Sequence, residues 1–211
     1  MAASDINPRS DRPPAEEGEC LAPAALRARL EEEISRAERH GTELSCLLVK
    51  IDNLDEMARE HGGELREQTV TYVAGALRRE LRRFDRIGLV DHGGEGERVV
   101  NRDLLIILPG ADSPKGEIVA RRALERLRTI KVEAGGTRQP LEISVGLAAW
   151  QRDLGAETLL AHASAAVRNV NGDQGYPGVN GGVASLAPQP APASTQARAG
   201  DSPAVGRAGS A

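Results

Sequence analysis

Apolar positions recur with clear periods through the middle of the chain, and the periods are lost at both ends. Residues 44–51 are almost continuously apolar, which is typical of a central strand covered on both faces. From Leu141 to Ala149 every second residue is apolar, which predicts a strand with one buried face. Two further strands are expected at Ile87–Val90 and Val99–Leu108, joined by a glycine-rich hairpin turn.

Apolar residues at helical spacing predict helices between and around these strands. They are expected over Pro23–His40, from a cap at Asn53 to His61, from Leu65 to Leu81, over Ser113–Ile130, and from Leu159 to Val170. The resulting order is αβααββαβα. It indicates an α+β fold of ferredoxin-like type, in which helices cover a mixed sheet with a central hairpin.

The two ends of the chain have a different composition from the middle. Residues 1–20 are polar and contain Pro8, Pro13 and Pro14, and residues 172–211 are rich in Gly, Ala, Pro and Ser. Such segments bury too little apolar surface to offset the entropy of the chain. We therefore expect disordered tails at 1–20 and 172–211, and one folded domain over residues 21–171.

Composition and charge exclude several classes of protein. Aromatic residues make up 2% of the chain, so the core must consist of Leu, Val, Ile and Ala. A net charge of -4 argues against a DNA-binding protein, which would need a basic face. Cys20 and Cys46 suggest no disulfide framework. No apolar run approaches the length of a membrane span and the N-terminus resembles no signal peptide, so a cytoplasmic protein is expected.

Several motifs follow one another along the predicted core in a characteristic order. They are LLVKIDNL at residues 47–54, His61-Gly62, RRFD at residues 82–85, LIILPGAD at residues 105–112 and ISVGLAAW at residues 143–150. In this order they resemble the GGDEF domain of diguanylate cyclases over residues 21–171, which implies a nucleotidyl-cyclase-type sheet. The resemblance also implies the joining of two GTP molecules into cyclic di-GMP, with Mg²⁺ bound between a strand aspartate and an acid of the hairpin turn.

This chain departs from the family pattern at the positions that carry the chemistry. The family's Asp-x-Asp motif uses its first aspartate as a metal ligand, and Lys50 stands there, so that only the second acid remains, as Asp52. An ammonium cannot bind Mg²⁺ and repels it. The guanine-reading asparagine corresponds to Ala58 and the guanine-reading aspartate to Glu67, while the phosphate-binding lysine corresponds to Asn171.

The second metal-binding acid depends on how the hairpin is aligned. If the alignment follows the turn glycines, Gly93-Gly-Glu-Gly-Glu97 is the family's motif and Glu95 is the acid. If it follows the strand after the turn, the motif is Val100-Asn-Arg-Asp-Leu104 and Asp103 takes that place. We favour the glycines, because a hairpin tip needs their backbone freedom. Asp52, Glu95 and Asp103 are thus metal ligands only if the domain is active; otherwise they are solvated acids at loops and strand ends.

Arg82 and Asp85 match the Arg-x-x-Asp site at which members of this family bind cyclic di-GMP. A guanidinium can hold a phosphate or a guanine edge through paired hydrogen bonds. We expect Arg82 and Asp85 to share one solvent-exposed corner. A purely structural explanation competes with this one, because basic residues are favoured at the end of a helix and four-residue motifs recur by chance.

Three functions remain open from the sequence. The favoured one is a catalytically inactive regulatory domain in bacterial cyclic dinucleotide signalling, without catalytic residues or cofactor, with cyclic di-GMP as the candidate ligand. The second is an active diguanylate or related nucleotide cyclase that uses Mg²⁺ at a rearranged site. The third is a scaffold that pairs with a second copy or another signalling protein and binds no nucleotide.

Overall fold

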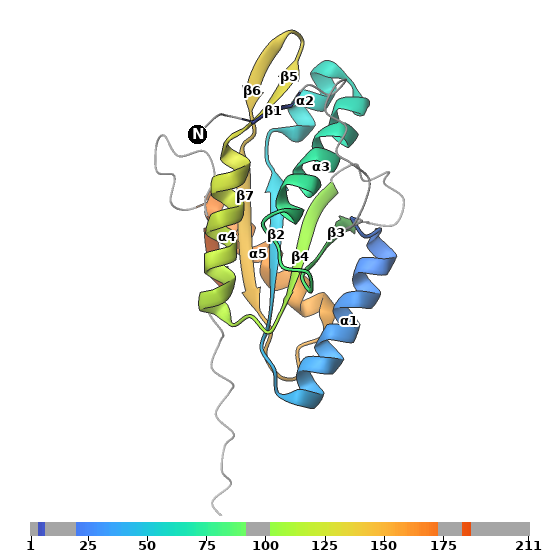
Figure 1. Ribbon diagram of the computed structural model, residues 1–211, viewed down its shortest axis with the longest axis vertical. Helices are drawn as coiled ribbons and strands as arrows, with labels where there is room; N and C mark the ends of the chain where they lie inside the picture. Colours follow the sequence, from blue (N-terminus) through green and yellow to red (C-terminus); the bar gives the residue numbers. More distant parts are fainter. Residues whose placement is uncertain (1–3, 7–19, 92–101, 173–182, 187–211) are drawn as a thin grey trace, which may run out of the picture.

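A five-stranded sheet forms the centre of the structure, a computed structural model that describes residues 4–6, 20–91, 102–172 and 183–186 (Figure 1). The strands lie in the order β3 (Arg86–Asp91), β4 (Arg102–Pro109), β2 (Leu44–Ile51), β7 (Ile143–Ala149) and β8 (Val183–Leu186). Neighbouring strands are antiparallel except β7 and β8, which are parallel. The most apolar strand of the sequence, β2, is therefore central, and the predicted α+β fold is confirmed.

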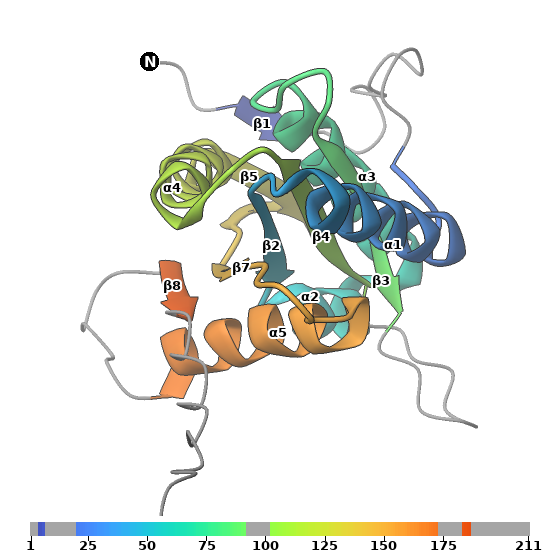
Figure 2. The same ribbon diagram turned by 90° about the horizontal axis from the view of Figure 1, so that it is seen from below.

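Helices cover both faces of this sheet. Helices α3 (Gly63–Arg78) and α4 (Ser113–Arg128) pack on one face, and α1 (Pro23–His40) and α5 (Ala156–Gly172) pack on the other. A view along the long axis shows α4 and α5 on opposite sides of β7 (Figure 2). The short helix α2 (Leu54–His61) follows β2 directly, so it begins at the end of the sheet where β2 finishes, and it leads into α3.

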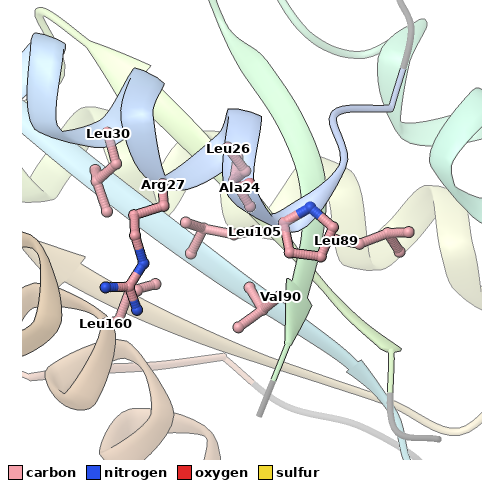
Figure 3. Close-up of a pocket in the computed structure, with 9 residues that line it drawn as sticks. Ala24, Leu26, Arg27, Leu30, Leu89, Val90, Leu105 and Leu160 are labelled. Atoms are coloured by element: carbon pink, nitrogen blue, oxygen red, sulfur yellow. The ribbon is translucent and has the colours of Figure 1, made fainter. Parts of the chain in front are cut away.

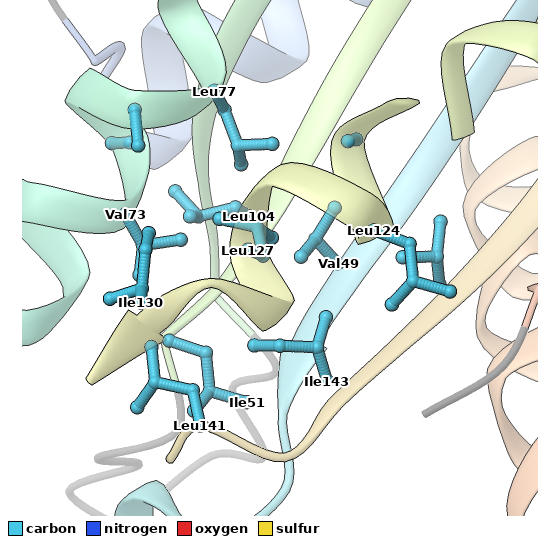
Figure 4. Packing of buried hydrophobic residues seen from close by; sticks show 14 of the residues in the cluster. Val49, Ile51, Val73, Leu77, Leu104, Leu124, Leu127, Ile130, Leu141 and Ile143 are labelled. Atoms are coloured by element: carbon cyan, nitrogen blue, oxygen red, sulfur yellow. The ribbon is translucent and has the colours of Figure 1, made fainter. Parts of the chain in front are cut away.

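The core between the sheet and the α3–α4 layer contains aliphatic side chains from both (Figure 4). Val49 and Leu104 come from the sheet, Val73 and Leu77 from α3, and Leu127 from α4. Alternate residues of β2 serve the other face, where Cys46 and Leu48 meet α1 and α5. Among the described residues no aromatic side chain is fully buried, so the core consists of aliphatic residues as the composition predicts.

Glycine allows α5 to lie directly on the backbone of β7. A Cβ atom at Gly146 would come within 2.3 Å of the Ala163 carbonyl oxygen and 2.7 Å of the Val167 nitrogen. Both neighbouring atoms belong to helix backbone, which cannot move aside as a flexible side chain could. The small residue in the middle of an otherwise apolar strand is therefore a packing requirement.

The edge strand β3 has one further backbone neighbour. Leu21 forms an isolated bridge with Gly88 of β3, with hydrogen bonds of 2.9 Å to the Ile87 carbonyl and from the Leu89 amide. At the other side of the sheet β8, which pairs with β7, is the edge strand. The bridge at Leu21 thus occupies part of the β3 edge, where an unpaired strand could otherwise pair with another molecule.

The observed elements differ from the predicted ones in three places. Residues 113–130 do not form one helix, because α4 ends at Arg128 and Ile130 begins β5 (Ile130–Ala134), which pairs with β6 (Thr137–Pro140). Gly135 and Gly136, both with positive φ, form the turn that the prediction missed. Residues 4–6 (β1) pair with β5, and β8 lies at 183–186, so two short strands occur in segments that we expected to be disordered.

Candidate functional site

The end of β2 places Lys50 and Asp52 beside β7. Lys50 lies opposite Ser144 in the register of the two strands. The buried Ser144 hydroxyl donates a hydrogen bond of 2.5 Å to Asp52 Oδ2, and Lys50 Nζ lies 3.6 Å from Asp52 Oδ1. Both carboxylate oxygens of Asp52 therefore have a partner within the protein, and one of these partners is a cation.

Asp103 belongs to the same end of the sheet. Leu104 of β4 lies opposite Val49 of β2, so the antiparallel register brings the preceding residue, Asp103, to the level of Lys50. The structure thus brings Asp52 and Asp103 to one end of neighbouring strands. Glu95 lies outside the described residues, and so does the hairpin turn on which the alternative alignments depend. Among the described residues no group of three or more His, Cys, Asp or Glu side chains gathers as a metal site would require.

Helices α2 and α3 hold the positions that correspond to the family's base-reading residues. Ala58 is buried, whereas Glu67 is exposed. Next to Glu67, Arg66 reaches from α3 to α2 and donates a hydrogen bond of 2.6 Å to Asp55 Oδ1. The Arg66 side chain is only 11% exposed, and its Nε is buried without a partner in the described part of the chain. An ion pair of the protein's own therefore joins the two helices beside the candidate base site.

Asn53 does not cap α2 through its side chain, as the sequence predicted, but makes other contacts at the end of β2. It stands at the N-cap position of α2, but its side chain makes no capping bond. Its amide donates to the Pro140 carbonyl at 3.0 Å and accepts from the Glu142 amide at 3.1 Å. Asn53 therefore ties the start of α2 to the segment that joins β6 and β7, and so helps to hold the end of β2 in place.

The turn that follows α3 contains Arg82 and Asp85, and it is closed by hydrogen bonds in both directions. The Asp85 carboxylate accepts from the Arg82 amide at 2.7 Å, and the Asp85 amide donates to the Arg82 carbonyl at 3.1 Å. Asp85 is 4% exposed, whereas Arg82 is exposed. The expectation that both side chains face solvent is thus wrong for Asp85, because its carboxylate turns inward to bond the backbone.

The surroundings of Asp85 shift the pKa of its carboxyl in opposite directions. Burial raises the pKa of its carboxyl above the ordinary value, and this is the dominant effect. The hydrogen bond from the Arg82 amide and the nearby guanidinium groups of Arg82, Arg78 and Arg86 lower the pKa, but only in part. The carboxyl is therefore a structural group of the turn whose charged form is disfavoured by burial.

Two arginines brace the same turn from its sides. Arg78 donates to the Asp85 carbonyl at 2.8 Å and to the Arg82 carbonyl at 3.3 Å. Arg86 donates to the Arg83 carbonyl at 2.7 Å. These arginines thus satisfy carbonyl groups of the turn itself.

The remaining arginines of this segment are free. Arg79, Arg82 and Arg83 are exposed, and their guanidinium groups have no partner among the described residues. Phe84, the single phenylalanine of the chain, directly follows Arg83 in the sequence and is 71% exposed. The sequence analysis missed Phe84. The available signal was an aromatic residue in an arginine-rich turn of a chain that has few aromatics.

A cavity of about 370 Å³ lies elsewhere, between α1, α5 and the β3–β4 strands (Figure 3). Its lining combines polar and apolar surface, and the apolar part includes Leu30, Leu105 and Leu160. Arg27 lies among the lining residues and forms an ion pair with Glu157 that joins α1 to α5. None of the predicted site residues lines this cavity.

In the described part of the chain, no helix combines the length and apolarity that crossing a bilayer requires.

Comparison with known proteins identifies relatives of this chain in sequence and in fold. The chain is 29% identical over 148 residues to the diguanylate cyclase DgcP of Pseudomonas aeruginosa, an alignment that covers 68% of this chain and 20% of that relative. The chain therefore spans about a fifth of the length of the curated protein it matches.

Solved structures share the fold. Diguanylate cyclase SiaD of Pseudomonas aeruginosa, in complex with its activator SiaC, superposes with a TM-score of 0.66 at 22% identity, covering 79% of this chain and 59% of that one. The GGDEF domain of DgcB from Caulobacter crescentus, in complex with cyclic di-GMP, gives 0.64 at 16% identity, covering 81% and 90%. The model of the diguanylate cyclase GGDEF domain matches residues 23–175, so the chain belongs to the GGDEF domain family.

Proposed function

We propose that this chain is a catalytically inactive GGDEF regulatory domain of bacterial cyclic dinucleotide signalling, and that it binds cyclic di-GMP at the Arg82–Asp85 turn. One observation carries the first part of the proposal. Lys50 occupies the position of a metal-binding aspartate, and its Nζ lies 3.6 Å from Asp52 Oδ1. The surviving acid is thus already matched by a cation of the protein.

The residues at the end of β2 do not fit Mg²⁺. This ion requires oxygen ligands in near-octahedral geometry, and an ammonium supplies none. A divalent ion bound by Asp52 would also stand beside the Lys50 charge, which repels it. Ser144 holds the other carboxylate oxygen. Without a metal to activate the attacking hydroxyl and neutralise phosphate charge, the domain lacks a contribution of several kcal/mol to catalysis.

The contact between α2 and α3 also supports an inactive domain, because it concerns the position at which the guanine base of the substrate would bind. Ala58 offers no side-chain hydrogen bond to a guanine, and the Arg66–Asp55 ion pair joins the two helices beside it. A GTP base entering here would have to displace a half-buried ion pair or leave polar groups without partners, which costs binding energy. Two independent requirements of the reaction, metal and base, are therefore unmet.

The Arg82–Asp85 turn supports the ligand-binding part of the proposal. Arg79, Arg82 and Arg83 are exposed and have no partner among the described residues, so within the described structure they can bind phosphates or guanine edges without breaking an ion pair. The structural relative DgcB was solved with cyclic di-GMP. Because only the fold is shared at that level of identity, the ligand has to be tested on this chain directly.

A cyclase assay tests the first part. Purified protein is incubated with GTP and Mg²⁺ or Mn²⁺, and cyclic di-GMP is measured by chromatography. We expect no product, because Lys50 occupies the position of a metal ligand and pairs with Asp52. Product that forms with the wild type and disappears in Asp52→Ala would overturn the proposal in favour of an active cyclase with a rearranged site.

Calorimetric titration with cyclic di-GMP at low salt tests the second part. Arg82→Ala should weaken binding by about 1.5–3 kcal/mol, the usual loss for a hydrogen bond to a charged group. Arg121→Ala, which removes an exposed arginine from α4, is the matched control and should bind as the wild type does. If the wild type binds no cyclic di-GMP, a scaffold that works through protein contacts takes the place of the receptor.

A further inference from the structure

The apex of the Arg82–Asp85 turn exposes an aromatic ring that no other part of the described structure covers. Phe84 and Ile118 are the only exposed large hydrophobic side chains among the described residues, and Phe84 is the more exposed, at 71%. An aromatic ring in water gives up most of the free energy that burial would provide. The ring therefore calls for an explanation other than packing.

We infer that the Phe84 ring is the surface on which a guanine base of the bound cyclic dinucleotide stacks, and that Asp85 is a positioning residue that does not touch the ligand. This inference rests on the proposed function and specifies which residues of the turn make contact. Arg82 supplies the hydrogen bonds and charge, and Phe84 supplies the flat apolar face.

The turn is built to hold its apex in one place. Reciprocal hydrogen bonds between Arg82 and Asp85 close it, and the guanidinium groups of Arg78 and Arg86 bind its carbonyl oxygens. A side chain on such a turn loses little further backbone entropy when a ligand binds. Preorganisation of this kind favours affinity for a small rigid ligand.

The neighbours of Phe84 define the chemistry of that ligand. The free guanidinium groups of Arg79, Arg82 and Arg83 favour an anion, whereas the ring favours a flat apolar face. Nucleotides combine the two, and stacking on an aromatic side chain is a common way to bind a base. A protein partner fits less well, because a stable interface needs an apolar patch, and a single ring among arginines does not provide one.

The hydrogen bond of Asp85 gives this residue a role within the turn. Its side chain is 4% exposed, and its Oδ2 accepts the Arg82 amide at 2.7 Å. Its contribution to binding is therefore to fix the backbone from which Arg82 and Phe84 project.

Calorimetry on the full chain separates these roles. Phe84→Leu keeps an apolar side chain but removes the π-face, and we expect cyclic di-GMP affinity to fall about tenfold, within the range of base stacking. Phe84→Tyr keeps the ring and should bind within about threefold of the wild type, since stacking tolerates changes at the ring edge. Wild-type affinity in Phe84→Leu, together with loss of binding in Arg82→Ala, would overturn the stacking role and leave the receptor function intact. Absence of binding to the wild type would instead reject the proposed function itself.

A spectroscopic probe reports the contact directly. Phe84→Trp places an indole at the apex, and guanine stacking should quench its emission on titration with cyclic di-GMP. The native Trp150, whose indole donates to the Leu154 carbonyl at 2.9 Å, provides the background signal measured in the wild type. Ligand-dependent quenching in Phe84→Trp but not in the wild type supports the inference, and equal responses in both contradict it.

The role of Asp85 is tested by a conservative and a disruptive variant. Asp85→Asn retains an oxygen that can accept the Arg82 amide, and we expect it to keep wild-type affinity. Asp85→Ala opens the turn and should weaken binding at least tenfold, as Arg82→Ala does. If Asp85→Asn abolishes binding while its melting temperature is unchanged, the carboxylate itself contacts the ligand and the positioning role is wrong.

If Phe84→Leu changes the sedimentation coefficient of the ligand-free protein, the ring serves a protein contact and the stacking role is wrong.

Discussion

Two regions of this domain carry closely spaced charges, and they treat them in opposite ways. At the end of β2 and between α2 and α3, cations and anions pair with one another, Lys50 with Asp52 and Arg66 with Asp55. At the turn after α3, Arg79, Arg82 and Arg83 are exposed and have no partner in the described structure. We call the first region, whose charges pair with one another, the closed region, and we call the second the open region.

This difference shows that pairing, rather than charge, indicates where a ligand can bind. A paired group has to lose its partner before it can serve a ligand, and the lost interaction reduces the net affinity. An exposed guanidinium without a partner loses only water. Under the proposed function, the first arrangement corresponds to a substrate site that the protein has filled, and the second corresponds to the cyclic di-GMP site.

The largest effect on stability should come from Asp85, on which the open region depends. Asp85→Ala leaves the Arg82 amide without its acceptor in a buried position, and we expect a loss of about 1.5–2 kcal/mol in the free energy of unfolding. Asp85→Asn should cost less, because its amide oxygen can still accept the bond. Urea unfolding followed by circular dichroism measures both variants, and equal losses in the two would show that the charge, not the hydrogen bond, holds the turn.

The pH dependence of stability in the wild type and in Asp85→Asn tests the environment of the Asp85 carboxyl. Burial raises the pKa of Asp85 in the folded state, so the folded protein holds this proton more tightly than the unfolded chain. The contribution of Asp85 to stability is therefore fully present below the unfolded pKa and is lost as pH rises through the folded pKa. The wild type should thus lose stability relative to Asp85→Asn as pH rises from about 3.9, the ordinary pKa of aspartate. A difference between the two proteins that stays constant with pH would contradict the raised pKa.

Arg66 should have the next largest effect, in the closed region. Arg66→Ala removes the bond to Asp55 and the packing of a side chain that is 11% exposed. Because Asp55 is 45% exposed, solvent screens part of the interaction, and we expect a loss of about 1–1.5 kcal/mol. Arg79→Ala removes the same charge from the open region and should change stability by less than about 0.5 kcal/mol. If Arg66→Ala and Arg79→Ala lower the free energy of unfolding equally, pairing does not distinguish the arginines of the two regions.

Much of the fold could be read from the pattern of residues, because burial on one or both faces leaves a period in the sequence. The bounds of α1 and β2 agree with their predicted ranges. The β5–β6 hairpin was missed even though Val132 and Ala134 alternate with exposed residues before the glycine pair, because the preceding helical period was extended too far.

The site was harder to predict, since its decisive contacts join residues that are distant in sequence. The bond from Ser144 to Asp52 spans 92 positions, and the Arg66–Asp55 ion pair connects two helices. Sequence motifs indicated which residues to examine, but not which of them the protein pairs internally. Asp85 illustrates this, because the Arg-x-x-Asp pattern does not show whether its carboxylate faces solvent or backbone.

The smallest effect should come from Lys50, whose side chain is 41% exposed. Lys50→Met removes the charge but keeps an unbranched side chain, and a half-exposed ion pair at 3.6 Å should contribute less than about 1 kcal/mol to stability. Lys50→Asp instead places a second carboxylate beside Asp52, and repulsion between the two should lower the melting temperature in EDTA. Mg²⁺ should raise the melting temperature of Lys50→Asp and leave those of the wild type and Lys50→Met unchanged, because a ligand stabilises only the form that binds it. Stabilisation of the wild type by Mg²⁺ through the Asp52 carboxylate, lost in Asp52→Ala, would show that the closed region still accepts a metal and would break the contrast between the two regions.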